Sequence, residues 1–312
     1  MLDRINRLLD RAMPVYAPLG VVLGVLFPSF FLGFRPFIPW IFGIITLAGA
    51  LKLQARELVK AVSTPLPLLF FFISSHVIMP LTVFLVSSLL FPNDPDIVSG
   101  YVLLYSVPTA VTSSIWVLIF KGDLALGLTL ILLDSLLAPV VVPGTVKLLL
   151  GTSISLDITG LTISLIFMVA IPTIIGVTLN ETSRGKIPSR VNPWISPISK
   201  FCITLVVAPN AAAAAPQIHP ENPLLWAVVA LCICFSAMGF SFGKLLGLTG
   251  KFSKEKQTTL FFTAGFRNTS AAMTLATGFF PGSAALPAVL GIMFQQMIAG
   301  IMSRIMLGKR EG

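Results

Sequence analysis

The sequence predicts an all-α integral membrane protein with ten transmembrane helices, arranged as two inverted repeats of five. The 312 residues are 55% hydrophobic and only 11% charged, whereas soluble domains carry about 25% charged residues. Apolar segments of about 20 residues, long enough to cross a bilayer as helices, recur along the whole chain. Lysine and arginine residues gather in alternate connections between these segments, as they do in multi-pass membrane proteins.

The ten predicted helices are joined by short connections. In chain order they cover 14–34, 36–53, 65–91, 98–120, 124–148, 158–180, 197–216, 223–247, 257–280 and 284–307. No polar stretch between them is long enough for a soluble domain, so we expect residues 1–312 to form one transmembrane domain. The charged, amphipathic start MLDRINRLLDRAM lacks the apolar core of a cleavable signal peptide.

The positive charges predict the orientation in the plasma (inner) membrane. If the N-terminus is cytoplasmic, all but three of the 21 Lys and Arg residues lie on the cytoplasmic side. The exceptions are Arg35 and Lys147, on the outer side, and Arg267, inside the ninth helix. This bias places both termini in the cytoplasm. Because the basic residues are spread over separate connections, we expect the partners to be the lipid bilayer and a small solute, and no nucleic acid.

A weak internal repeat relates residues of about 14–148 to residues of about 158–307. Thr109-Ala110 corresponds to Thr263-Ala264, and Asp134-Ser135 falls opposite Gln295-Gln296. Because each copy has five helices, an odd number, the second copy must be inverted in the membrane. Inverted repeats of this kind are typical of secondary transporters.

Two short runs of hydroxyl and amide residues interrupt apolar segments at matching repeat positions. Such runs either bond back to their own helix or mark breaks at mid-membrane, where free backbone groups bind ions and anions. Their matching positions favour breaks. The predicted substrate-binding residues are Thr112, Ser113, Ser114, Arg267, Asn268, Thr269 and Ser270. Asn210, which follows the helix-disturbing Pro209, is a further candidate for the same cavity.

Three titratable or charged residues lie within predicted spans: His76, Asp134 and Arg267. A charge at the bilayer centre costs about 2.5–3.5 kcal/mol, so such residues usually face a cavity or a partner. Asp134 and Arg267 either form one buried ion pair or line the cavity with Arg267 facing an anion, and the two interpretations are compatible. We expect His76 to be a hydrogen-bonded packing residue, with a proton relay as the alternative. The candidates for ion or proton coupling are Asp134, Ser135, Thr263, Ser75, His76, Gln295 and Gln296.

Catalytic and metal-binding motifs do not point to an enzyme. The chain has no HExxH or GxSxG motif and no acidic cluster. Cys202, Cys232 and Cys234 lie in apolar segments, and we interpret them as small core residues rather than a disulfide or metal site. A passive scaffold or receptor has no need of charges at mid-membrane. We expect no cofactor, and a monomer or a weak oligomer.

The pattern resembles the bile acid:sodium symporter family over nearly the whole chain. The nearest local matches are HVIMPLTVFLVSSLL and AGFRNTSAAMTLA. The resemblance implies a panel of helices one, two, six and seven, and a core of helices three to five and eight to ten. It implies that helices four and nine are unwound and crossed at mid-membrane. It also implies secondary transport of an organic anion, such as a steroid conjugate, a keto acid or pantoate, by alternating access. A carrier of the auxin-efflux or arsenite type is the alternative.

The chain departs from the sodium ligands that this resemblance implies. Sodium-coupled members have a Glu and then a Gln-Asn pair in the ninth helix, where this chain has Thr263 and Arg267-Asn268. The Ser-Asn of the fourth helix is Ser113-Ser114 here, and the Gln of the third helix falls on Ser75. Hydroxyl ligands of the fifth helix fall on Gly127 and Ile131.

Arg267 therefore occupies the place of a ligand that should meet a cation. We expect it to act as a built-in cation, with weak or absent sodium dependence. A coupling ion, where there is one, is then a proton, and Asp134 is its first candidate because an apolar site favours a protonated carboxyl group. Facilitated transport without an ion, and sodium bound by other ligands, stay open.

Overall fold

The computed structural model describes residues 15–54, 65–151 and 157–308, and every regular element in these ranges is a helix. Six of the described helices are long and apolar enough to cross a membrane. They are Pro65–Leu90, Leu124–Leu150, Ile158–Thr182, Lys186–Gln217, Pro223–Thr249 and Gly282–Met306. Large apolar side chains are exposed along them, which lipid would cover. The predicted all-helical membrane class is confirmed.

The other four predicted spans are two shorter apolar helices and two interrupted ones. The shorter helices are Val15–Leu26 and Arg35–Ala50. The interrupted pairs are α7 (Pro95–Ser106) with α8 (Ser113–Ile119), and α14 (Lys254–Gly265) with α15 (Thr269–Phe279). That all ten spans cross the bilayer stays a prediction.

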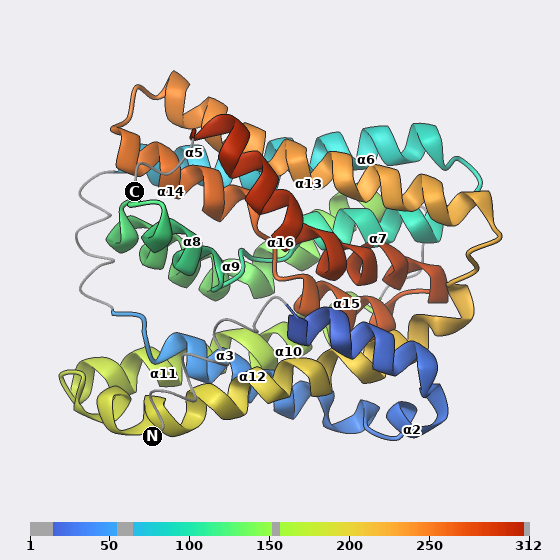
Figure 1. Cartoon of the computed structure of the whole chain (residues 1–312), viewed down its shortest axis with the longest axis horizontal. Coiled ribbons are helices and arrows are strands. Elements are labelled where there is room, and N and C mark those ends of the chain that lie inside the picture. Colours follow the sequence, from blue (N-terminus) through green and yellow to red (C-terminus); the bar gives the residue numbers. More distant parts are fainter. Residues whose placement is uncertain (1–14, 55–64, 152–156, 309–312) are drawn as a thin grey trace.

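Figure 1 shows the helices running along one common direction in two groups. The lower group in that view contains α2 (Pro28–Leu32), α3 (Ile38–Ala50), α11 (Ile171–Thr182) and α12 (Lys186–Ala214). The upper group contains α5 (Pro65–Ile73), α6 (Met79–Leu90), α7, α8, α13 (Pro223–Thr249), α14 and α16 (Leu286–Met306). Between them lie α9 (Leu124–Leu150) and α15, which contact members of both groups, and α10 (Ile158–Leu165), which contacts α9 and α15.

Glycines allow helices to approach closely within each group. Gly100 of α7 packs against the backbone of Ala284, and Gly24 packs against the backbone of Ala208 in α12. A side chain would have no room at either position, as is common where membrane helices pack.

The prediction that all three cysteines are core residues is wrong for one of them. Cys202 and Cys232 are buried, but Cys234 is exposed. Residues two positions apart on a helix point to opposite sides, so Cys234 faces away from Cys232.

Both interrupted helices open near the middle of the molecule, where Figure 1 shows α8 and α15 separated from their partners. Pro108 explains the first break, because proline has no backbone N–H and forces the preceding residue out of helical geometry. Val107 is accordingly extended, with φ −63° and ψ 155°. We expected the first break at 112–114, but it lies over residues 107–112, and Ser113 and Ser114 are the first residues of α8.

The second break has no proline, and it ends where Asn268 caps the start of α15. Phe266 is extended, with φ −87° and ψ 128°. Asn268 then restarts the helix, because its side-chain oxygen accepts a hydrogen bond from the N–H of Ala271 at 3.2 Å, as N-cap residues do. The two breaks bond directly to each other, since the N–H of Asn268 donates to the carbonyl oxygen of Pro108 at 2.9 Å.

Candidate functional site

A cavity of about 240 Å³ lies against both breaks. One wall is largely apolar and comes from the lower group, with Ala17, Ile45 and Ile203 among its residues. The opposite wall carries hydroxyl and amide groups from the first residues of α8 and α15 and from the middle of α16. An apolar space with a few polar groups at one end is the usual form of a small-molecule site.

Most of the predicted site residues line this cavity. Those that do are Thr112, Ser114, Ser135, Arg267, Asn268, Thr269, Ser270, Gln295 and Gln296. The breaks bring the clusters at 112–114 and 267–270 together, because each cluster stands at the start of a half-helix that begins at mid-molecule. Trp116 fixes one of them, since its ring N–H donates to the side-chain oxygen of Gln296 at 2.9 Å.

Two predicted substrate-binding residues lie elsewhere. Asn210 is not part of the cavity lining: its amide donates to the hydroxyl of Thr274 at 2.9 Å and accepts from that of Thr277 at 2.6 Å. It therefore joins α12 to α15 instead of facing a substrate. Ser113 is also outside the lining and is fully buried.

Arg267 stands at the break, and its guanidinium group is buried on backbone carbonyl groups. Only 1% of the residue is exposed. Nη2 donates to the carbonyl oxygen of Ser75 at 3.1 Å and Nη1 to that of Val107 at 3.4 Å. Gln295 holds the backbone on both sides, accepting from its N–H at 3.1 Å and donating to its carbonyl at 3.0 Å. Direct contact of this guanidinium group with an anion in the cavity stays a prediction.

The two carbonyl groups that accept hydrogen bonds from Arg267 belong to irregular backbone. Ser75 belongs to a π-helical turn, Ser74–Ile78, between α5 and α6. Val107 directly follows the last residue of α7. Helix ends and π-turns leave carbonyl groups without their regular partners, and the C-terminal end of a helix carries partial negative charge. The fold thus provides a place for a cation, and a guanidinium group occupies it.

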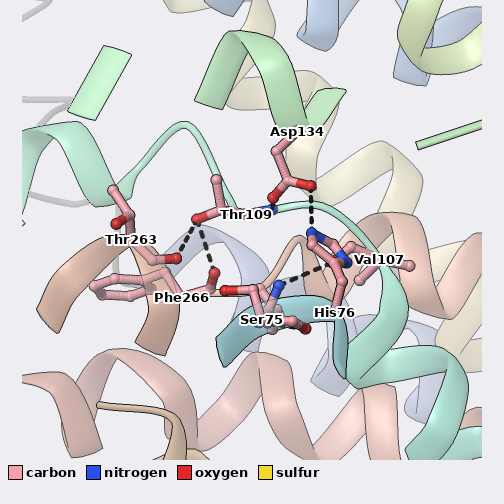
Figure 2. A network of polar contacts seen from close by, with 8 residues as sticks. Ser75, His76, Val107, Thr109, Asp134, Thr263 and Phe266 are labelled. Atoms are coloured by element: carbon pink, nitrogen blue, oxygen red, sulfur yellow. Dashed lines mark hydrogen bonds and ion pairs between the residues drawn. The ribbon is translucent and has the colours of Figure 1, made fainter. Parts of the chain in front are cut away.

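Asp134 bonds to His76 and to the first break, as Figure 2 shows. Its Oδ1 lies 2.7 Å from Nε2 of His76, and its Oδ2 accepts the N–H of Thr109 at 2.7 Å. Within the part of the chain that the structure describes, Asp134 forms no ion pair with Arg267, so the direct pair is not found. The expectation of a hydrogen-bonded His76 is confirmed, and its ring stacks on Phe72 with centroids 5.6 Å apart.

Thr109 was not predicted as a site residue. Its hydroxyl group contacts the carbonyl oxygens of Thr263 at 2.7 Å and Phe266 at 2.9 Å, so it ties the first break to the second (Figure 2). It also lines the cavity. Its place directly after Pro108 was the available signal, because a hydroxyl group beside free backbone is well placed to bond with it.

Two lysines of the lower group also line the cavity and were not predicted as site residues. Lys52 follows α3, and Lys200 lies on α12, where it is buried. We counted both with the cytoplasmic connections. Both positions nevertheless fall inside the bounds of predicted spans, 36–53 and 197–216, and this was a usable signal.

The sequence is similar to proteins of one family. Residues 39–220 match the model of the sodium bile acid symporter family. The chain is 38% identical over 290 residues to the uncharacterized protein YbaS of Bacillus subtilis, covering 93% of this chain and 94% of that protein. It is 26% identical to the uncharacterized sodium-dependent transporter YocS of the same organism, covering 93% of this chain and 89% of YocS.

A plant relative extends the same relationship. The chain is 26% identical to the probable sodium/metabolite cotransporter BASS1 of Arabidopsis thaliana chloroplasts, covering 96% of this chain and 74% of that protein. The family and the names of these relatives describe transporters rather than enzymes. With its long apolar helices, the chain is a multi-pass membrane protein and a secondary transporter. It belongs to the sodium bile acid symporter family.

Proposed function

We propose that this protein moves a small organic anion across the plasma (inner) membrane, and that Arg267 stands permanently in the place of a coupling sodium ion. The observation that carries the proposal is the buried guanidinium group on the carbonyl oxygens of Ser75 and Val107. A bound sodium ion would seek the same kind of oxygen ligands. Arg267 satisfies them with a charge that cannot leave.

The cavity supports an anionic substrate. Lys52 and Lys200 line it with basic side chains, and none of its described lining residues is acidic. The N-terminus of α15 adds the partial positive charge of a helix end, and its first residues, Thr269 and Ser270, add hydroxyl donors. The apolar wall opposite suits the hydrocarbon part of an organic acid better than a fully hydrated inorganic ion.

The cycle that we propose is alternating access by two inverted five-helix repeats. The interrupted pairs α7–α8 and α14–α15 occupy corresponding places in the two halves and bond to each other, which supports a site at the repeat interface. The two groups of helices in Figure 1 then correspond to the panel and the core. Relative movement of these groups would open the cavity to one side and then to the other.

Membrane topology is the first testable part of this proposal. We expect a cysteine placed at Lys254 to be labelled only from the cytoplasm, and cysteines placed at Arg35 or Lys147 to be labelled from outside. The reason is the concentration of positive charge in the connections that contain Lys254. The measurement is labelling of intact cells with a membrane-impermeant maleimide, after replacing the three native cysteines with alanine. External labelling at Lys254 would overturn the orientation.

Sodium independence is the second expectation. A sodium ion enters with the substrate and leaves on the other side, so its gradient drives the cycle, whereas Arg267 returns with the empty carrier and supplies no gradient energy. We expect proteoliposomes to take up a labelled organic anion at the same rate in sodium, potassium or choline chloride. The probes are a steroid conjugate, a keto acid and pantoate, chosen by thermal-shift screening of the purified protein. A steep, saturable sodium requirement in the wild type would contradict the built-in cation.

A further inference from the structure

The pair formed by His76 and Asp134 lies beside the first helix break, but the function proposed above gives it no role. Its carboxylate group holds the first break through Thr109, whose hydroxyl group holds the second break. Thr109 also lines the cavity. The pair is therefore one hydrogen bond away from the first break and two away from the second, and Thr109 alone separates it from the cavity.

His76 has one unsatisfied ring nitrogen. Nε2 faces Asp134, while Nδ1 is buried and has no hydrogen-bond partner among the described residues. In the neutral ring Nδ1 is an acceptor without a donor, and in the protonated ring it is a donor without an acceptor. Buried polar atoms are normally paired, so an orphan of this kind calls for a functional explanation.

The surroundings of His76 leave Asp134 as its titratable partner. Of the helices that the structure places against the π-turn with His76, α5 and α6 contain no titratable side chain. On α7 and α13, the buried titratable groups bond elsewhere: Tyr101 to Val228, Tyr105 to Ser236 and Cys232 to Pro287. The other titratable groups of α7, α9 and α13 are Asp96, Lys147, Cys234 and Lys244. Arg267, in the second break, donates to the carbonyl oxygen of Ser75, the residue directly before His76.

We propose that the His76–Asp134 pair binds the coupling proton, and that one proton accompanies each anionic charge of the substrate. The proposal rests on the proposed function. With a neutral His76, the charges of Asp134 and Arg267 cancel. When a monoanion binds and one proton from water joins the pair, the charges cancel again. The empty and the loaded cluster are both neutral, which keeps the cost of burial in the membrane low in both states.

The proton transfer changes only N–H and O–H bonds. Water on the side of higher proton concentration donates a proton to the pair as the anion binds, and the pair returns it to water on the other side. Histidine suits this task because its imidazole group exchanges a proton near neutral pH in water. Sodium is not needed, because the proton gradient supplies the energy that the fixed Arg267 cannot.

The first experiment needs no substrate. The chain has only two histidines, and His219 is exposed beside Glu221 in a connection, so it serves as an internal control. We expect NMR of ¹³C-labelled histidine in the purified protein to show that the His76 ring changes its protonation state with pH. The Asp134→Asn variant should alter the His76 titration and leave that of His219 unchanged. A His76 signal that does not respond to pH, or whose response is unaffected by Asp134→Asn, would overturn the proton site.

The second experiment measures coupling with the probe anions named above. An inward proton gradient should accelerate uptake by the wild type, and a pH dye inside the vesicles should record one proton per monoanion. His76→Gln keeps a hydrogen-bond donor for Asp134 but cannot titrate, so the acceleration of uptake by the proton gradient should fall at least tenfold. His219→Gln should behave as the wild type.

The two proposals fail in different ways. Uptake that ignores the proton gradient would overturn the proton site and leave anion transport standing. No uptake of any probe by the wild type would count against the proposed function, and the NMR titration would still decide whether the pair binds a proton.

Discussion

The Arg267→Gln variant is expected to bind sodium, whereas the wild type does not. Removing the guanidinium group leaves the carbonyl oxygens of Ser75 and Val107 without a cation and leaves the Asp134 carboxylate as the buried charge of the site. Gln is also the residue that sodium-coupled members carry at this place. A sodium ion should therefore enter the vacated site, and anion transport by this variant should be lost in potassium and recovered, at least in part, in sodium.

Thermal unfolding measures this effect without a substrate. A ligand at 100 times its dissociation constant stabilises the folded state by about 2.7 kcal/mol. Soluble domains of about 150–250 residues shift by about 2–4 °C per kcal/mol, so a measurable rise of the melting temperature follows. We expect that increase in sodium, and not in potassium, for Arg267→Gln alone.

Two further variants control for charge and for the family's missing carboxylate. Arg267→Lys keeps a positive charge and should not respond to sodium, but it should transport poorly, because a point charge cannot reproduce two directed bonds to separate carbonyl groups. The double variant Thr263→Glu/Arg267→Gln restores both family residues and should bind sodium more tightly than Arg267→Gln. Equal stabilisation of wild type and Arg267→Gln by sodium would contradict the built-in cation.

The Asn268→Asp variant is expected to fold normally and to lose anion transport. Asn268 caps α15 through its side-chain oxygen, and Asp is an equally good N-cap residue that also interacts favourably with the positive end of the helix. The new carboxylate lies at the wall of the cavity, beside Thr269 and Ser270. Two like charges about 4 Å apart repel by about 4 kcal/mol at an effective dielectric constant of about 20, which is more than about a hundredfold in affinity.

The matched control for this variant is Asn268→Ala. It removes the cap without adding a charge, so it should lower the free energy of unfolding by about 1 kcal/mol and weaken anion transport far less than Asn268→Asp does. The measurements are thermal unfolding and anion uptake for both variants. An Asn268→Asp protein that transports anions as well as Asn268→Ala would mean that the substrate does not approach the start of α15.

The sequence by itself determined the all-helical membrane class and the two segments that are interrupted, but not every bound, since α12 begins at Lys186 and not at 197. Composition and hydrophobic length carry this information locally, because a lipid-facing helix needs about 20 apolar residues in a row. Pro108 and Asn268 also act locally, the first by removing a backbone donor and the second by capping the next helix. The position of the first break was misplaced by a few residues because the polar cluster, and not Pro108, was taken as its mark.

Only the tertiary structure decided which charges and hydrogen bonds meet. Sequence reasoning placed His76, Asp134 and Arg267 in the membrane and offered an ion pair of Asp134 with Arg267 as one of two interpretations. In the structure Asp134 bonds to His76, 58 positions away, and Arg267 reaches Ser75, 192 positions away. A side chain at a helix break can point to either side of it, and the choice depends on which distant carbonyl or carboxylate groups the packing brings within hydrogen-bond distance. That packing buries the Arg267 guanidinium group on two backbone carbonyl groups. It also makes Thr109, which the internal repeat matched to Thr263 without giving it a role, the link between the two breaks.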